Sequence, residues 1–259
     1  MYKSDMVKDF TVTGGKSLAR YHYAEKGAKT YVVLKGSVGA VLNGRKTVLT
    51  EGDIFNAEAW YPYSLELLGD DTVVREVSAC KSKHVCFLPD PADPVDTDKA
   101  EIGEVSCKGK CIYEFSAEGI NLQLKVGRWQ LDGVKEIWEC NVEKGYRIAF
   151  NNRLDCEGLY MIKSGEFLVQ VDDREFILDE STGEIVSIPA ETAFAFTALT
   201  ENCVIQDFSV DCHLFRLLEM VEAAQDYFPE KLEDQSYKDY LFEANKVIAF
   251  ESIKKEQDE

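Results

Sequence analysis

The sequence predicts an all-β protein made of two tandem barrels, followed by a short α-helical C-terminal tail. Three observations predict this fold class. The chain repeats itself at a period of 131 residues, both copies contain short strand-like apolar runs, and helical spacing occurs only near the end. With 259 residues, 45% of them hydrophobic, the chain is long enough for two domains that each bury a core.

The repeat is clearest where residues 68–79 (LGDDTVVREVSA) return as residues 199–210 (LTENCVIQDFSV). Upstream, residues 31–36 match residues 160–165 at an offset of 129. A period this long indicates a duplicated domain rather than a solenoid. Three pairs of positions are therefore predicted to be equivalent: Gly36 and Gly165, Gly52 and Gly183, and Tyr63 and Phe194.

Within each copy the pattern is that of an antiparallel barrel or sandwich. Val38, Ala40 and Leu42 alternate up to Asn43-Gly44, a dipeptide typical of a tight hairpin because both turn positions need a positive φ. Residues 167–178 repeat the arrangement around Asp172-Asp173, with weaker turn chemistry. Several such short strands in each copy favour a closed or sandwiched sheet.

We predict four segments: a barrel over 1–88, a linker over 89–110, a barrel over 111–211 and a helical tail over 212–259. The linker begins with half of the protein's 6 prolines, which cannot donate to a sheet ladder and favour an extended chain.

The tail shows two helical faces. The first is carried by Leu214, Leu217, Leu218 and Val221, at spacings of three and four. Ser236 and Asp239 resemble a capping box for a second helix, whose face would be Tyr237, Tyr240, Leu241, Ala244 and Ile248. Such helices either cover a barrel end or pair with another subunit.

Charge and targeting signals narrow the partners and the compartment. With 47 acidic and 29 basic residues, the net charge of −18 would repel nucleic acid and anionic membranes. The polar N-terminus and the lack of an apolar stretch of about 18 residues predict no membrane association and a cytoplasmic protein. The 8 cysteines are then expected to be reduced thiols.

The two copies resemble the cupin superfamily. Gly36-Ser-Val-Gly-Ala and the segment from Gly52 to Pro62 look like the two cupin motifs, and the segments starting at Gly165 and Gly183 look like a second set. The chain up to about residue 210 is thus similar to a bicupin. The resemblance implies two jelly-roll barrels of the double-stranded β-helix type.

Cupin activity usually depends on a metal held by two His and one Glu of the motif G-x5-H-x-H-x(3–4)-E-x6-G, and by one His of the second motif. Because residues at i and i+2 face the same side of a strand, H-x-H directs two imidazoles into the barrel. In the first copy the four positions hold His22, Ala24, Lys29 and Tyr63. One ligand of four survives, so we expect no metal and no cofactor.

In the second copy no ligand survives. Asn151, Arg153 and Phe194 occupy ligand positions, and a guanidinium repels a cation. Asn151 and Arg153 share a face and could clamp a carboxylate. The alternative, which we favour, is an internal ion pair of Arg153 with Asp155, Glu157 or Glu191.

His22, Lys29 and Tyr63 are the candidate ligand-binding residues. They would converge inside the first barrel as a pocket for a small polar or anionic molecule, with Lys29 as counter-charge, Tyr63 as donor and His22 as a titratable group. The alternative is a decayed site whose polar groups satisfy one another. We expect the first barrel, rather than the second, to hold any pocket, because Phe194 fills volume.

A second metal possibility is a structural zinc at Cys80, His84, Cys86, Cys107 and Cys111. The spacings match no common zinc site, and free cysteines are often small buried hydrophobic residues. We favour buried thiols.

The sequence therefore predicts a metal-independent small-molecule binding or sensing protein, without evident catalysis, that forms a homodimer. Two alternatives stay open. One is a cupin-type isomerase or epimerase that uses His22 and Tyr63 for proton transfer, and the other is an assembly module that binds nothing.

Overall fold

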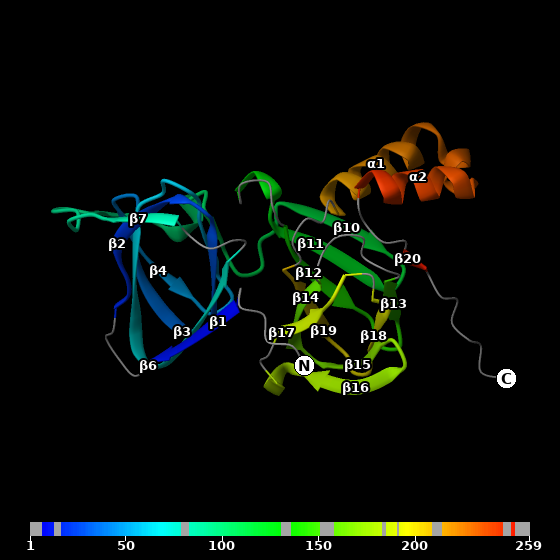
Figure 1. The fold of residues 1–259 in the computed structure, drawn as a ribbon, viewed down its shortest axis with the longest axis horizontal. Coiled ribbons are helices and arrows are strands. Elements are labelled where there is room, and N and C mark those ends of the chain that lie inside the picture. The colour runs from blue at the N-terminus through cyan, green and yellow to red at the C-terminus, as the bar shows by residue number, and fades with distance from the viewer. Residues whose placement is uncertain are drawn as a thin grey trace. The chain divides into compact units, whose positions relative to one another are not determined.

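The computed structural model describes residues 7–12, 17–78, 83–130, 136–150, 158–182, 185–190, 192–208, 214–245 and 250–251. The chain divides into two compact units: an N-terminal unit (residues 4–111 and 128–134) and a C-terminal unit (residues 1–3, 112–127 and 135–259). Strands dominate both, and the two α-helices follow the last long strand (Figure 1). A mostly β chain with helices near its end is therefore confirmed.

The described residues of the N-terminal unit form nine strands: β1 (Val7–Val12), β2 (Ser17–Lys26), β3 (Lys29–Leu42), β4 (Arg45–Thr50), β5 (Ile54–Ala57), β6 (Tyr63–Ser78), β7 (Lys83–Phe87), β8 (Val95–Asp96) and β9 (Val105–Ser106). They form one sheet in the order β7-β2-β6-β3-β4-β8, to which β1 adds along β6, β5 along β3 and β9 along β5. The long strands β3 and β6 are antiparallel from Lys29 opposite Ser78 to Leu42 opposite Tyr63.

The sheet of the N-terminal unit curls where β3 and β6 lose register. The pairing shifts between Val33 and Ser37, next to Gly36 with a φ of +79°. The curl brings Tyr31, near the start of β3, against Tyr63, which pairs with the last residue of β3. The buried side chains of both halves, including Val33, Leu42, Leu49, Phe55, Leu65, Leu67 and Val74, form one apolar core.

In the C-terminal unit, the part of the chain that the structure describes forms eleven strands and two α-helices: β10 (Tyr113–Ala117), β11 (Ile120–Val126), β12 (Ile137–Val142), β13 (Arg147–Phe150), β14 (Gly158–Ser164), β15 (Glu166–Val171), β16 (Arg174–Asp179), β17 (Ile185–Ile188), β18 (Phe194–Ala198), β19 (Cys203–Asp207), α1 (Leu214–Tyr227), α2 (Gln235–Asn245) and β20 (Phe250–Glu251). Two sheets, β10-β11-β12-β19-β14-β17 and β16-β15-β18-β13-β20, enclose its core.

The internal repeat of the sequence is a repeat of strand pairing. Tyr31 faces Glu76 between β3 and β6, and its sequence equivalent Tyr160 faces Asp207 between β14 and β19. Tyr63 begins β6 as Phe194 begins β18. Gly183, predicted to be equivalent to Gly52, lies outside the described residues.

Local turn chemistry behaves as predicted at the first hairpin. Asn43 and Gly44 both have positive φ values, 49° and 77°, and join β3 to β4. This is the backbone twist that a two-residue hairpin requires, and few residues other than Asn and Gly adopt it at low cost.

The predicted linker is only partly extended. Its three prolines lie within residues 89–94 and stay outside the sheet, as expected of residues without an N–H donor. Beyond them, β8 pairs with β4, and β9 pairs with β5. Strands β8 and β9 therefore belong to the N-terminal sheet, which corrects the prediction of an extended linker over the whole of 89–110.

The tail forms two helices, and its first predicted face is confirmed because Leu214, Leu217 and Leu218 of α1 are buried. The predicted capping box at Ser236 and Asp239 is wrong. The Asp234 carboxylate accepts the Ser236 N–H at 2.9 Å, and α2 begins one residue before Ser236. Ile248 lies outside the described residues. No helix in the described part of the chain is long and apolar enough to cross a membrane.

Two equivalent glycines are expected to be irreplaceable. A Cβ added at Gly36 would lie 2.6 Å from Thr72 Oγ1, and one at Gly165 would lie 2.6 Å from Cys203 Sγ. With φ values of +79° and +77°, Gly36→Ala and Gly165→Ala should each lower the free energy of unfolding by about 3 kcal/mol, from backbone strain and overpacking together.

Gly69→Ala is the matched control for these substitutions. Gly69 also has a φ of +79°, but a Cβ there meets nothing within 4 Å, so only the backbone strain of about 1 kcal/mol applies. Denaturant unfolding of the three variants measures the difference. Equal losses at positions 36 and 69 would contradict the close approach.

Candidate functional site

The structure brings together two of the three predicted site residues. His22 in β2 pairs with Tyr63 at the start of β6, and their ring centroids are 4.6 Å apart. Both are buried, with exposed fractions of 9% and 3%. The prediction that a titratable ring and a phenol meet inside the N-terminal unit therefore has a geometric basis.

Lys29 reaches this pair only through other residues. Its Nζ lies 3.0 Å from Glu76 Oε2, while the Tyr31 hydroxyl lies 2.8 Å from the Tyr63 hydroxyl and interacts with Glu76. Tyr31 and Glu76 were not among the predicted site residues. Because they face each other across β3 and β6, the barrel contains a continuous polar path from Lys29 to Tyr63.

The protonation states along this path follow from burial. Burial, reinforced by Tyr63 and Glu76, raises the pKa of Tyr31 well above its usual value. Burial also raises the pKa of Tyr63 strongly, and this outweighs the opposing effect of its hydrogen bond with Tyr31. Both phenols therefore keep their protons near neutral pH and serve as hydrogen-bond donors, not as bases.

The tautomer of His22 is fixed by the backbone. Nδ1 lies 2.6 Å from the carbonyl oxygen of Arg20. A carbonyl oxygen only accepts, so Nδ1 carries the proton and donates, which leaves Nε2 as an acceptor when the ring is neutral. No carboxylate orients this imidazole among the described contacts of His22.

Aromatic rings surround the polar path. Phe55 meets Tyr63 edge-on at 5.3 Å and stacks on Tyr31 at 6.0 Å, and both of these interior contacts are deeply buried. Phe87 lies 5.8 Å from His22 and is 70% exposed. His22 thus links a closed aromatic interior to a solvent-facing ring.

A separate groove lies in the same unit. It has a volume of about 1020 Å³ and is bounded by β2, β3, β4, β6 and the proline-containing segment 87–96. Its lining includes Tyr21, Val48 and Leu68, but not His22, Lys29 or Tyr63. The groove and the polar path are therefore different candidate locations for a ligand.

The matching region of the C-terminal unit lacks counterparts of Lys29 and of the Tyr63 hydroxyl, although the buried Asp207 still faces Tyr160. Tyr160 packs on Phe194 and Phe196 at 5.4 Å and 5.1 Å, and Gly158 stands two residues before Tyr160, where Lys29 precedes Tyr31. Phe150, rather than Asn151, pairs with Phe194. Asn151, Arg153, Asp155, Glu157 and Glu191 lie outside the described residues, so the predicted clamp and its alternative ion pair stay predictions.

The described cysteines give no support for a zinc site. Cys80 lies outside the described residues, and no group of three or more His, Cys, Asp or Glu side chains that could hold a metal occurs within the described ones. Cys86 contacts the carbonyl oxygen of His84 at 3.7 Å. Burial raises the pKa of the Cys107 thiol, which disfavours the thiolate that zinc needs.

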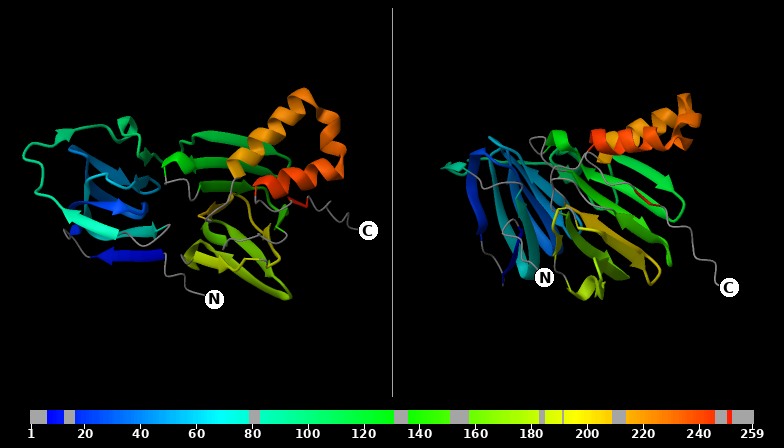
Figure 2. Two further views of the ribbon diagram at one scale, coloured as in Figure 1. Left: turned by 45° about the horizontal axis from the view of Figure 1, so that its top comes forward. Right: turned by 45° about the vertical axis from the view of Figure 1, so that its right-hand side comes forward.

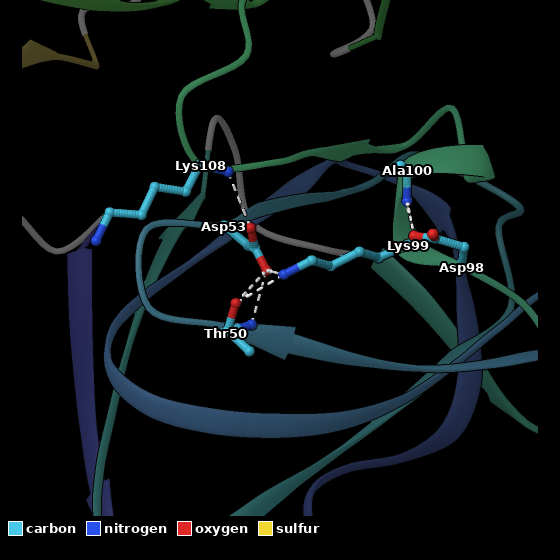
Figure 3. Close-up of polar contacts among 6 residues, drawn as sticks. All are labelled: Thr50, Asp53, Asp98, Lys99, Ala100 and Lys108. Carbon is cyan, nitrogen blue, oxygen red and sulfur yellow. Dashed lines mark hydrogen bonds and ion pairs between the residues drawn. The ribbon is translucent and has the colours of Figure 1, made fainter.

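Sequence reasoning also missed the most connected buried carboxylate of the N-terminal unit. Asp53 is fully buried and accepts hydrogen bonds from the Thr50 and Lys108 N–H groups at 2.7 and 2.9 Å, and from Lys99 Nζ at 2.5 Å (Figure 3). Burial alone would raise the pKa of Asp53, but these donors hold it below its usual value. All its partners are internal, which makes this cluster a structural anchor for residues 99–108.

No protein-family model matches the chain, and no curated protein matches it. Solved structures do match. A single-residue mutant of salicylate 1,2-dioxygenase from Pseudoaminobacter salicylatoxidans has a TM-score of 0.59 at 13% identity, covering 78% of this chain and 68% of that one. Oxalate decarboxylase of Lactobacillus farciminis, in a formate complex, has a TM-score of 0.52 at 12% identity, covering 87% and 85%. The coconut allergen cocosin has a TM-score of 0.53 at 11% identity, covering 78% and 75%.

These proteins belong to the cupin superfamily, and their likeness supports a cupin-type β-barrel fold for this chain. They include two enzymes and an allergen, so the shared fold does not select among functions. Function has to be argued from the residues of this chain.

Proposed function

We propose that this protein is a metal-independent bicupin, with one cupin barrel in each unit, that binds or senses a small polar molecule without turning it over. The observation that carries the proposal is the polar path Lys29–Glu76–Tyr31–Tyr63, buried except at Lys29, with the His22 ring tilted against Tyr63 at its end. Ligand sites typically combine apolar walls with a few fixed polar groups, and this path has both.

The contacts narrow the chemistry of the ligand. Lys29 was expected to be the counter-charge for an anion, but its ammonium group is paired with Glu76 at 3.0 Å. A second anion would therefore face the carboxylate of Glu76 as well as the ammonium. An uncharged, hydroxylated molecule avoids this repulsion and can use His22 Nε2 and Tyr63 as partners.

The catalytic alternative receives less support from the same contacts. Tyr63 is a poor proton-transfer group near neutral pH, because its raised pKa means that the hydroxyl does not easily give up its proton. Among its described contacts, His22 is oriented by a backbone carbonyl and by no carboxylate. We therefore propose binding without an isomerase or epimerase step.

The proposal is tested by binding measurements on the intact protein. Calorimetric titration with a panel of neutral monosaccharides and polyols, and a matched panel of small carboxylates, should give binding in the first panel only. Tyr63→Phe should weaken that binding about tenfold, because one buried hydrogen bond to the ligand is lost. His22→Ala should weaken it by a similar factor.

Tyr21→Phe is the matched control, because Tyr21 lines the separate groove. Weakening by Tyr21→Phe and not by Tyr63→Phe would move the ligand to that groove and contradict the proposal. Consumption of the bound molecule would favour the enzyme. If neither panel binds, the assembly module becomes the better explanation.

Binding should also be unchanged after the protein is dialysed against a chelator.

A further inference from the structure

The far end of the helical hairpin exposes aromatic rings. Tyr227, Phe228 and Tyr240 are 74%, 51% and 57% exposed, and Tyr237 lies 6.3 Å from Tyr240 between ring centroids. We call these four residues the hairpin patch. Soluble proteins rarely expose several large aromatic side chains together unless they contact a partner.

The patch arises because the hairpin packs on its barrel only in part. Leu214, Leu217 and Leu218 of α1 join the core of the C-terminal unit, as does Leu241 of α2. The left view of Figure 2 shows α1 and α2 at an angle to each other, joined by a connection that lies away from the strands. Tyr240 was expected on the packed face of α2, but the structure leaves it exposed.

Two rings of the patch already contact a cationic side chain of the protein itself. Lys231, in the short connection between the helices, places Nζ 5.0 Å from the centroid of Phe228 and 5.7 Å from that of Tyr237. Both distances fall in the range where an ammonium group is attracted to the negative face of an aromatic ring. The contact shows that these rings are positioned to accept positive charge.

The charge of the hairpin indicates the sign of a partner. Residues 214–245 carry eight Asp and Glu side chains against three Lys and Arg. A second copy of this chain, with a net charge of −18, would be repelled by that field. A basic segment would be attracted by it.

From these observations we infer that the hairpin patch is a docking surface for a basic segment of another protein. Arginine side chains of that segment stack on Tyr227 and Tyr240, while the surrounding carboxylates attract their charge. Arginine suits the site better than lysine because its planar guanidinium stacks on aromatic faces. This inference is independent of the ligand proposed for the N-terminal unit.

The test uses the full-length protein and a fluorescently labelled peptide of alternating arginine and glycine, with binding followed by anisotropy. Replacing both Tyr227 and Tyr240 with alanine should weaken binding about tenfold, because two cation–π contacts are lost without any change in charge. Trp60→Ala is the matched control, since Trp60 is 60% exposed in the other unit. It should change the affinity less than about twofold.

Lys231→Ala gives a second measurement. It uncovers the rings of Phe228 and Tyr237, so it should tighten binding more than Lys238→Ala, which removes the same charge from α2 with no ring contact among the described residues. Equal effects of the two substitutions would contradict stacking. Unchanged affinity after the double tyrosine substitution would overturn the inference, because the peptide would then bind only through the overall negative charge of the protein. Sedimentation at micromolar concentration decides the remaining case, because a dimer abolished by that double substitution would overturn the inference in favour of a second copy.

Discussion

Asp53→Asn is expected to lower the free energy of unfolding by about 3 kcal/mol, because it removes the charge that a buried cluster is built around. The asparagine keeps the shape but cannot accept from Lys99, Thr50 and Lys108 with the strength of a carboxylate, and one of its polar atoms becomes a donor facing donors. Denaturant unfolding at neutral pH measures the loss.

The same cluster predicts how the free energy of unfolding changes at acidic pH. The pKa of Asp53 is lowered in the folded protein, so its contribution is complete above the unfolded value of about 3.9 and disappears as pH falls through the folded value. Wild-type protein should therefore lose more stability than Asp53→Asn between about pH 5 and pH 2. Asp98→Asn is the control, since this exposed side chain only caps a short helix through Ala100. Parallel acid profiles for wild type and Asp53→Asn would refute the assignment.

Glu136→Ala is expected to detach the start of α1 and to cost about 3 kcal/mol. The buried Glu136 carboxylate accepts from the Trp138 indole N–H at 2.8 Å and from the Phe215 backbone N–H at 3.0 Å. It therefore ties β12 to the N-terminal end of α1, where a negative charge is also favoured by the helix dipole. Hydrogen exchange should accelerate in α1, while the N-terminal unit keeps its protection.

Glu143→Ala provides the comparison, because Glu143 follows the same strand but is exposed. It should change the free energy of unfolding by less than about 0.5 kcal/mol. If Glu136→Ala left the exchange rates of α1 at wild-type values, packing of Leu214, Leu217 and Leu218 alone would hold the helix.

The parts of the fold that local chemistry controls could be predicted. The Asn43-Gly44 hairpin and the buried face of α1 follow from residues that are neighbours in the chain. The start of α2 was misplaced because two acceptors compete there. Asp234 comes two residues before Ser236 and takes its N–H, so the later capping signal at Ser236 is not used.

The site was only half predictable, because its other half depends on strand register. Motif spacing identified His22 and Tyr63, and they meet. Glu76 approaches Lys29 only because β3 and β6 pair in one register, which no local signal fixes. A usable signal did exist, since the repeat retains a tyrosine and a carboxylate at both pairs of positions.

Counting residues back from a glycine did not anticipate the strand partner of Phe194 in the second copy. His22 pairs with Tyr63 in the first copy, whereas Phe150, one residue before Asn151, pairs with Phe194 in the second. Strand pairing is set by contacts across the sheet, so spacing along the chain does not fix it.

The hydrogen bond between Tyr31 and Tyr63 satisfies two buried hydroxyls before any ligand arrives, and either oxygen can be the donor. The ligand proposed above would have to break this bond in order to use either hydroxyl. The hydrogen bonds that it forms would then replace one that already exists, and such an exchange contributes only about 1 kcal/mol net. Most of its affinity would therefore have to come from apolar contact with the surrounding rings.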